Sequence, residues 1–428
     1  MATNNNLKEL SFLIYGLGIT GQSVVKFFKK NKIKNYFVWD DNNKNLYKKK
    51  RTNNLNKTME KVQYIVLSPG VSLNNSKNRK ILSKYRGKII TDIDLIFLLK
   101  NFFKSIVITG TNGKSTTCKI LFNVLKKNRF RVLLGGNIGT PILDLKIHKK
   151  SFLIIEASSF QLAHSKFIRP DFALLLNITN DHIDWHGSMK NYINSKLKIF
   201  KLQKSNQFCL INPSLKSLIN KKNFFGKLII TNPQKYQKIK TKLKNPYLNL
   251  DINDENMSYV YALSKLLNIS EKSFLKSLKN FEGLPHRYEV FLKKKNCVFI
   301  NDSKATTFQA SKFALRNTKN IYWIVGGLPK KNDKINFKNL DKNIIKSYIV
   351  GKNINFFKSQ IQNKINYAVT KNLKNSLTLI LKDIKIFKRK NNNILFSPAA
   401  ASFDQFLNFE KRGDKFKKLS HYYARKYI

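Results

Sequence analysis

Acidic residues and cysteines are scarce in this chain. Its 428 residues include 24 Asp and Glu against 81 Lys and Arg, which gives a formal net charge of +57. Cys118, Cys209 and Cys297 lie far apart and form neither a CxxC pair nor a Cys/His zinc pattern. No apolar run reaches the ~18 residues of a membrane-spanning helix, and the amino terminus lacks the pattern of a secretory signal. The sequence therefore predicts a reduced, cytoplasmic protein without a membrane span.

Apolar residues are plentiful despite the charge. Hydrophobic residues make up 42% and aromatic residues 12%, which excludes a wholly disordered chain, and the length predicts two or three domains. A strong positive charge is typical of nucleic-acid-binding proteins. Here Lys is spread over the whole chain, without a helix-turn-helix, zinc-finger or RNA-recognition motif. We therefore expect no specific nucleic-acid partner, although the positive field will attract anionic substrates.

Short apolar runs alternate with longer amphipathic stretches, which is the pattern of an α/β fold with parallel sheets. Polar stretches at 100–104 and 283–287 separate three series of expected strands. We therefore expect a Rossmann-like domain over 1–100, a central P-loop ATPase domain with a mostly parallel sheet over 101–284, and a C-terminal Rossmann-like α/β domain over 285–428. The expected strands are 12–15, 36–39, 64–67, 88–90, 105–109, 131–134, 152–155, 172–176, 297–300, 322–325, 347–350 and 394–396.

The strongest local motif is IVITGTNGKST at residues 106–116, a strand that runs into a glycine-rich turn and then a helix. Backbone N–H groups of such a turn can approach phosphates closely, Lys114 can reach the outer phosphates, and Ser115 can bind Mg²⁺. The spacing GxxGK[ST] is shorter than the usual GxxxxGK[ST], and a turn without a nucleotide can have this sequence too. We interpret it as an ATP site formed by Gly110, Thr111, Asn112, Gly113, Lys114, Ser115 and Thr116.

A second glycine motif, GLGITG at residues 16–21, follows the first expected strand, and Asp40 ends the next one. Taken alone, the GxGxxG match predicts a dinucleotide site with Asp40 on a ribose. The same loop can equally hold another nucleotide diphosphate, such as a UDP group, at the helix N-terminus. It can also be a purely structural turn, so three interpretations stay open.

Several further polar side chains follow expected strands. Glu156 ends SFLIIE, at the edge of the sheet where a carboxylate can hold Mg²⁺ beside phosphates. His182, in NITNDHID, can be a structural histidine, but its place near a nucleotide site favours a role there. Asp302 and Lys304, in NDSKAT, offer a carboxylate for a ribose or metal and a cation for phosphates. Composition and spacing do not distinguish Lys196 from an ordinary solvated helix lysine.

Together these motifs resemble the Mur ligase family. They are GLGITG, SPG, TGTNGKST, GGNIG, EASSFQL, NITNDHID, YINSKLKIF, FEGLPHRYE, NDSKAT and SPAAASFDQFLNFEKRG, in this order from residue 16 to residue 413. The phosphate loop and NDHID are typical of the whole family, whereas the first and last motifs are similar to its D-glutamate-adding member. The resemblance implies an ATP-dependent ligase that joins UDP-N-acetylmuramoyl-L-alanine to D-glutamate through an acyl phosphate, in cytoplasmic peptidoglycan precursor synthesis.

Three alternatives are kept beside this interpretation. The first is another Mur-type or folylpolyglutamate-type amide ligase with a different amino-acid substrate. The second is a nucleotide-binding protein that retained the glycine loops without catalysis, although such a protein would not need Lys114, Glu156 and His182 together. The third is a basic, nucleic-acid-stimulated ATPase. The amino-acid dependence of ATP hydrolysis separates the amide ligases from one another, and stimulation of ATP hydrolysis by DNA would favour the third alternative.

The resemblance also implies roles for individual residues, with the UDP-sugar on the first domain, ATP on the central domain and the amino acid on the last, in a monomer. Positions similar to UDP-substrate contacts are Ile19, Thr20, Asp40, Ser68, Gly70, Asn137, Ser158 and Gln161. Further ATP positions are Asn256, Arg287, Asp302 and Lys304. Positions similar to D-glutamate contacts are Thr306, Lys330, Ser402, Phe403 and Phe409. Two Mg²⁺ ions would be held by Ser115, Glu156, His182 and Lys196, of which Lys196 would carry a carbamate. The catalytic residues would be Lys114, His182 and Lys196.

Two segments depart from the family pattern. The usual Gly-x-His-Asn segment, whose asparagines help to hold adenine, appears here as DENM at 254–257. Glu255 replaces the histidine, and Tyr259 stands where a second asparagine is expected. Asp41 and Asn42 follow Asp40 where family members often carry an arginine. The contacts to adenine and to uracil are therefore expected to differ from the family pattern.

Overall fold

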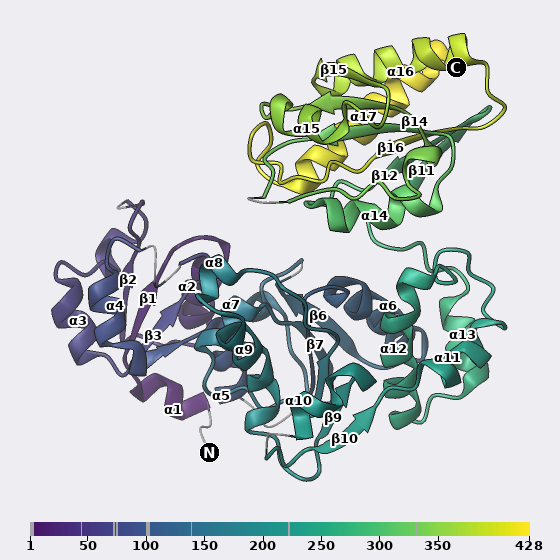
Figure 1. Cartoon of the computed structure of the whole chain (residues 1–428). Helices are drawn as coiled ribbons and strands as arrows, with labels where there is room; N and C mark the ends of the chain where they lie inside the picture. Colours follow the sequence, from purple (N-terminus) through teal and green to yellow (C-terminus); the bar gives the residue numbers. More distant parts are fainter. Residues whose placement is uncertain are drawn as a thin grey trace. The chain divides into compact units, whose positions relative to one another are not determined.

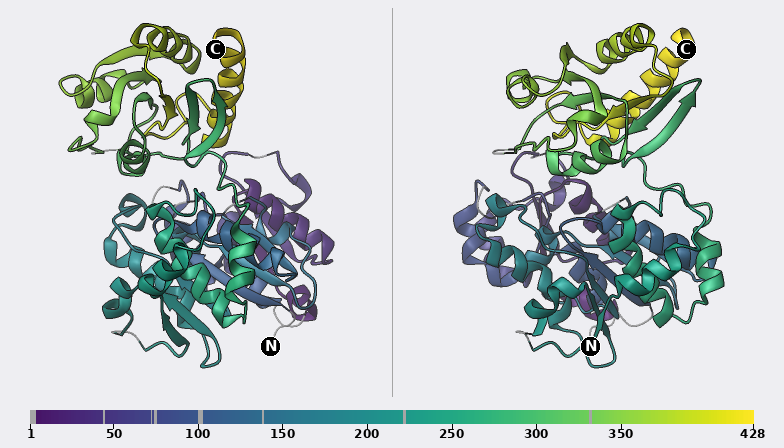
Figure 2. Two further views of the ribbon diagram at one scale, coloured as in Figure 1. Left: turned by 90° about the vertical axis from the view of Figure 1, so that its right-hand side faces the viewer. Right: turned by 45° about the vertical axis from the view of Figure 1, so that its right-hand side comes forward.

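The computed structural model describes residues 4–43, 45–71, 73, 76–99, 103–137, 139–220, 223–330 and 333–428. The chain forms two compact units, Met1–Phe281 and Glu282–Ile428 (Figures 1 and 2). The first unit contains two sheets and the second unit contains one. Helices pack on the faces of each sheet, as in α/β proteins with parallel strands.

The first sheet has four parallel strands in the order β2-β1-β3-β4. Apolar side chains of β1 are completely buried on both faces, which is why the strand is continuously hydrophobic. The strands are β1 (Phe12–Tyr15), β2 (Tyr36–Trp39), β3 (Tyr64–Leu67) and β4 (Ile89–Ile90). The helices are α1 (Asn4–Glu9), α2 (Ile19–Lys30), α3 (Leu55–Lys61), α4 (Arg79–Lys84) and α5 (Asp92–Leu98).

The central sheet has six parallel strands in the order β10-β9-β8-β5-β7-β6. Ile106 and Ile108 of β5 pack in one cluster with α6, α12 and α13, whereas Val107 packs in another with α7 and α9. The strands are β5 (Lys104–Thr109), β6 (Val132–Gly136), β7 (Phe152–Glu156), β8 (Phe172–Leu175), β9 (Phe208–Ile211) and β10 (Lys227–Ile230). The helices are α6 (Lys114–Lys127), α7 (Ser159–His164), α8 (Ile183–His186), α9 (Met189–Lys201), α10 (Lys216–Asn220), α11 (Pro233–Lys240), α12 (Asp254–Leu266) and α13 (Glu271–Leu278).

The sheet of the second unit has the order β11-β12-β16-β13-β14-β15, and the β11–β12 pair is antiparallel while the others are parallel. Helices α14 and α15 cover one face, and α16 and α17 cover the other (Figure 1). The strands are β11 (Glu289–Lys294), β12 (Cys297–Asn301), β13 (Ile321–Gly326), β14 (Ile344–Val350), β15 (Tyr367–Lys371) and β16 (Asn392–Phe396). The helices are α14 (Phe308–Asn317), α15 (Ile354–Ile361), α16 (Leu373–Phe387) and α17 (Phe409–Tyr427).

The α/β class with mostly parallel sheets is confirmed, and every expected strand is present with its ends shifted by at most three residues. The apolar pattern did not predict β9, β10, β11 and β15. Three of these lie at sheet edges, where exposed and charged side chains interrupt the apolar pattern. The expected boundary near residue 100 stays a prediction. In the described part of the chain, no helix has both the length and the hydropathy needed to span a membrane.

Candidate functional site

The polar segments predicted to form the ATP site follow or end three neighbouring strands of the central sheet. The order β8-β5-β7 places the turn at 110–113, the segment at 176–182 and the carboxyl end of β7 at one edge, because parallel strands end on the same side. Asn177 joins two of these loops: its Oδ1 accepts from the N–H of Asn112 at 2.9 Å, and its carbonyl accepts from the N–H of Thr111 at 3.0 Å. The phosphate loop is thus fixed against the segment that leads to His182.

Gly113 starts helix α6 with a φ of +80°, a conformation that favours glycine. A Cβ at this position would lie 2.2 Å from Oδ1 of Asn256. That oxygen accepts from the hydroxyl of Thr117 at 3.1 Å, and Asn256 is almost fully buried. Asn256, a predicted ATP contact, therefore packs directly against the phosphate loop.

We expect Gly113→Ala to weaken ATP binding about tenfold, because a left-handed alanine costs roughly 1–2 kcal/mol and its Cβ would displace Asn256. Isothermal titration calorimetry with ATP measures the effect. Gly87→Ala is the matched control, since a Cβ there meets nothing within 4 Å. Equal ATP affinity in the two variants would contradict this account of the loop.

Two lysine ammonium groups converge on one carbonyl of the phosphate loop. The oxygen of Gly110 accepts from Nζ of Lys114 at 2.9 Å and from Nζ of Lys196 at 2.8 Å. Lys196 lies on α9 and is 1% exposed. Burial, together with the charge of Lys114, lowers its pKa to about 6. Lys196 is therefore no solvated helix lysine, which the sequence pattern alone did not reveal.

Tyr192 also faces this loop and was not among the predicted site residues. Its hydroxyl shares a 2.9 Å hydrogen bond with the hydroxyl of Thr111, and its ring lies 4.7 Å from Nζ of Lys196. Tyr192 and Lys196 are four residues apart on α9, and this spacing places them on one side of the helix. The signal was present in the motif YINSKLKIF, but helical spacing alone does not say which loop that side contacts.

Glu156 is the last residue of β7 and is 2% exposed. Its Oε1 accepts from the amide of Asn137 at 3.0 Å, while its Oε2 is buried and has no hydrogen-bond partner among the described residues. A buried carboxylate oxygen without a partner is costly unless a cation or donor approaches it. An oxygen donor at the phosphate edge therefore fits Mg²⁺, which is bound by one or two carboxylates together with water and phosphate oxygens.

His182 precedes α8 and has a φ of +55°, which is uncommon for a histidine. Its Nε2 lies 3.3 Å from a carboxylate oxygen of Asp181, and its ring lies 4.8 Å from the ring of Phe160. Among the described residues, no group of three or more His, Cys, Asp and Glu side chains could hold a metal by itself. A metal at this edge would therefore be completed by water and nucleotide oxygens, and the predicted pair of ions stays a prediction.

The two departures in the adenine segment have structural partners. Glu255 accepts from the amide of Asn177 at 2.9 Å and from the amide of Asn212 at 2.8 Å. Tyr259 is completely buried, and its hydroxyl donates to the carbonyls of Leu175 and Leu176 at the end of β8. Glu255 and Tyr259 thus brace the loops around the phosphate turn from α12. In the sequence, both residues are recognisable only as departures from the family pattern.

The first sheet holds the second glycine motif. Gly16 has a φ of +90°, and a Cβ at Gly21 would lie 1.9 Å from the carbonyl oxygen of Gly16, so the turn and α2 pack too closely for a side chain. The hydroxyl of Ser68 donates to the same carbonyl at 2.7 Å. Ile19 is 79% exposed at the start of α2, and Gly70 is exposed too. Thr20 is half-buried beside Ile19.

Asp40 organises this loop. Its carboxylate accepts from the backbone N–H groups of Leu17, Asn42 and Asn43 at 2.6, 2.9 and 2.8 Å. Burial raises its pKa, but these hydrogen bonds and the charge of Arg51 outweigh burial and hold the pKa below its usual value. The guanidinium of Arg51 also donates to the carbonyl of Asp40 at 3.2 Å. A guanidinium is therefore present beside Asp40, although Asp41 stands where an arginine was expected.

We expect Asp40→Ala to raise the KM for the UDP-linked substrate about tenfold and to leave the KM for ATP unchanged, because the carboxylate that ties the N–H of Leu17 in the glycine turn to those of Asn42 and Asn43 is lost. Steady-state kinetics with each substrate varied measures both constants. Asp40→Asn retains one acceptor oxygen and should have an intermediate effect. An unchanged KM in both variants would refute a role of this loop in substrate binding.

Ser158 and Gln161 are both almost fully buried at the start of α7 and form a capping box. The amide of Gln161 also donates to Asp92 at 3.1 Å, across to the start of α5. Burial raises the pKa of Asp92 to about 6. The two predicted substrate contacts are therefore held by each other and by Asp92 of α5, and their role toward substrate stays a prediction.

In the second unit, the strands β12, β16 and β13 are neighbours and end at the same edge. Asp302 follows β12 and accepts from the N–H of Tyr288 at 3.1 Å and from the hydroxyl of Ser397 at 2.7 Å. Burial raises its pKa to about 7, opposed by these hydrogen bonds and by the charge of Arg287. Nζ of Lys304 lies 5.2 Å from the centre of the Phe409 ring.

The other predicted residues of this unit lie on the same loops. Thr306 is half-buried after β12, and Lys330 is exposed after β13. Ser402 is buried after β16, whereas Phe403 beside it is 70% exposed. Among the predicted residues of this unit, the structure shows Lys304 beside the ring of Phe409, although the two lie far apart in the sequence.

The chain is similar to known proteins over nearly its whole length. The family model described as "Mur ligase middle domain" matches residues 108–264. A UDP-N-acetylmuramoylalanine–D-glutamate ligase from Wolbachia (subspecies Brugia malayi) is 35% identical, over 96% of this chain and 95% of its own. A Rickettsia prowazekii protein of the same name is also 35% identical, over 97% and 99%. Among solved structures, the MurF ligase of Thermotoga maritima in complex with ADP has a TM-score of 0.59 at 16% identity, covering 100% of this chain and 98% of its own.

Proposed function

The chain belongs to the Mur ligase family, and from this membership we propose that it joins UDP-N-acetylmuramoyl-L-alanine to D-glutamate with hydrolysis of ATP to ADP and phosphate. The single observation that carries the proposal is full-length similarity, at up to 35% identity, to curated ligases of that name. The phosphate-loop geometry in the first unit supports the ATP half of the reaction. We further propose that the enzyme acts in the cytoplasm as a monomer.

A carboxylate does not acylate amines, because it is anionic and lacks a leaving group. ATP would therefore transfer its γ-phosphoryl group to the L-alanyl carboxylate, which gives an acyl phosphate and ADP. The amine of D-glutamate would then attack the acyl carbon, and phosphate would leave as the amide forms. In this scheme the protein positions the reactants and neutralises charge, and no covalent enzyme intermediate is needed.

Each proposed role corresponds to a feature of the first unit. Lys114 would place its ammonium group on the β- and γ-phosphates, since its Nζ already lies over the loop carbonyls of Gly110 and Thr111. Ser115, Glu156, His182 and carbamylated Lys196 would hold Mg²⁺. Bound there, Mg²⁺ would neutralise charge on the phosphate oxygens. The structural support for this assignment is the buried Oε2 of Glu156, which has no hydrogen-bond partner among the described residues.

A carbamate on Lys196 also fits its surroundings. Nζ of Lys196 and Nζ of Lys114 donate to the same carbonyl, and burial together with the charge of Lys114 lowers the pKa of Lys196 to about 6, which favours its neutral amine. Addition of CO₂ to the neutral amine, with loss of one proton, would give a carbamate anion beside the ammonium group of Lys114 and would present oxygen ligands, which Mg²⁺ prefers.

The choice of amino acid is tested by offering the purified protein ATP, Mg²⁺ and UDP-N-acetylmuramoyl-L-alanine with one amino acid at a time. We expect mass spectrometry to detect the condensed product with D-glutamate and not with L-glutamate, L-alanine or a diamino acid. If a product forms only with another amino acid, that amino acid would replace D-glutamate as the proposed substrate, and the proposed ligase chemistry would stand.

A further inference from the structure

Arg412 is a cation buried in the second unit. It lies in the first turn of α17 and is 3% exposed. Burial lowers its pKa to about 10, and the charge of Asp404 opposes this shift. A buried guanidinium is costly to desolvate unless its N–H groups form hydrogen bonds. Nothing in the sequence analysis or in the family resemblance assigned Arg412 a role.

The guanidinium of Arg412 is bonded to two different loops. Its Nη2 donates to the carbonyl of Ser303 at 2.7 Å and to the carbonyl of Ala400 at 2.9 Å, and its Nε donates to the hydroxyl of Ser303 at 3.1 Å. Ser303 lies in the loop after β12, between Asp302 and Lys304. Ala400 lies in the loop after β16, two residues before Ser402. One planar group thus joins the two loops.

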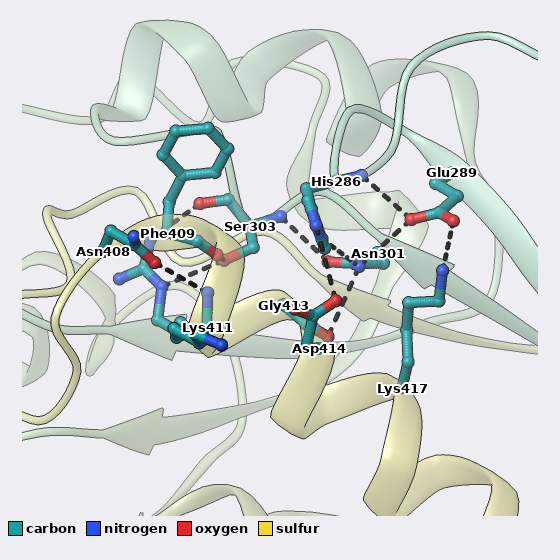
Figure 3. Close-up of polar contacts among 11 residues, drawn as sticks. His286, Glu289, Asn301, Ser303, Asn408, Phe409, Lys411, Gly413, Asp414 and Lys417 are labelled. Atoms are coloured by element: carbon teal, nitrogen blue, oxygen red, sulfur yellow. Dashed lines mark hydrogen bonds and ion pairs between the residues drawn. The ribbon is translucent and has the colours of Figure 1, made fainter. Parts of the chain in front are cut away.

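Both loops carry predicted D-glutamate positions, and so does the helix from which Arg412 projects. Thr306 follows Ser303, Ser402 and Phe403 follow Ala400, and Phe409 is the first residue of α17. The hydroxyl of Ser303 donates to the carbonyl of Phe409 at 2.9 Å, as Figure 3 shows. Three segments that hold the predicted amino-acid site therefore meet at Arg412.

The start of α17 is itself fixed in place. A Cβ at Gly413 would lie 2.2 Å from Nδ1 of His286, so only glycine allows this close approach. The amide of Asn301, at the end of β12, lies 2.9 Å from the same nitrogen (Figure 3). The helix therefore cannot shift toward its neighbours to compensate for a shorter side chain at residue 412.

A third loop closes over the other side of the guanidinium. Nη1 of Arg412 is buried, has no hydrogen-bond partner in the described part of the chain, and would lie 3.2 Å from a Cβ at Gly327. Gly327 has a φ of +140°, and its Cβ would also lie 2.5 Å from the carbonyl oxygen of Ala401. The turn after β13 thus packs against the same guanidinium that joins the other two loops.

We infer that Arg412 is a positioning residue for the amino-acid substrate: its guanidinium sets the spacing between loops 302–306 and 397–404 and so the placement of Thr306, Ser402 and Phe403. The inference rests on the proposed function for the identity of the substrate. Lysine cannot replace arginine in this role, because an ammonium group lacks the planar fork that bonds two carbonyls and a hydroxyl together.

The test compares Arg412→Lys, Arg412→Ala and the exposed control Arg425→Ala on the same helix. For Arg412→Lys we expect the KM for D-glutamate to rise about tenfold and the KM for UDP-N-acetylmuramoyl-L-alanine to change less than about twofold, because the predicted residues for the latter lie in the first unit. Guanidinium ion, but not methylammonium, should partly restore Arg412→Ala. A fall in kcat with both KM values unchanged would overturn the inference.

Hydrogen exchange gives a readout that does not depend on activity. We expect Arg412→Lys to lose protection in 302–306 and 397–404, while the strands of the second unit keep theirs. If Arg412→Ala does not fold, Gly327→Ala displaces the 397–404 loop with Arg412 intact and should raise the same KM. If the wild-type enzyme does not use D-glutamate, the proposed function fails by itself, whereas unchanged exchange in both loops would overturn the positioning role.

Discussion

Lys196→Ala is expected to lose most of the ligase activity, with kcat falling roughly 10²–10³-fold, the usual effect of removing one preorganised electrostatic group. The substitution removes a 1% exposed side chain that touches the phosphate loop through the carbonyl of Gly110. It also removes the proposed carbamate, so formate or acetate at millimolar concentration should restore part of the activity. Steady-state kinetics with and without the added carboxylate measures both effects.

The control for this prediction is Lys201→Ala, at the exposed end of the same helix. It should retain wild-type kinetics and should not respond to added carboxylate. Turnover of Lys196→Ala near the wild-type rate would refute the carbamate assignment. If a folded variant loses activity and no short carboxylate restores it, the carbamate role is excluded and Lys196 only positions the phosphate loop.

Lys114→Ala is expected to have a comparable effect, lowering kcat about 10³-fold, because its ammonium group would stabilise charge on the transferred phosphoryl group. Its Nζ donates hydrogen bonds to the carbonyls of Gly110 and Thr111 in the glycine-rich turn. Trapping of the acyl phosphate with hydroxylamine in a single turnover measures the first step directly. Lys119→Ala, exposed on the same helix, is the matched control.

The outcome for Lys114→Ala separates positioning from chemistry. We expect the rate of formation of trapped acyl phosphate to fall together with kcat, because Lys114 would act in the first step. A variant that forms acyl phosphate at the wild-type rate, and is slow only in amide formation, would contradict the role proposed for Lys114.

The sequence predicts those features that depend on local pattern. Apart from β9, the alternation of apolar runs located the interior strands of all three sheets, because buried parallel strands are continuously hydrophobic. The turn at Gly113 was recognisable because a strand, a glycine and Lys-Ser-Thr occur together. Edge strands such as β10 were missed because exposed side chains replace the apolar run there.

What the sequence did not predict depends on contacts between distant segments. The sequence pattern indicates a solvated lysine at residue 196, whereas in the fold Nζ of Lys196 donates to the carbonyl of Gly110. Glu255 reads as a departure from a pattern until Asn177 and Asn212 are seen to bind its carboxylate. Arg412 lies within a recognised motif, but its bonds to Ser303 and Ala400 exist only in the folded unit. These are tertiary contacts that no local spacing encodes.

The most direct test of the account is phosphate release by the purified protein with ATP and Mg²⁺, with UDP-N-acetylmuramoyl-L-alanine and D-glutamate added separately and together. The account predicts sustained release only when both are present, and none when L-glutamate replaces D-glutamate. Release that needs neither substrate, or that responds to DNA instead, would contradict it.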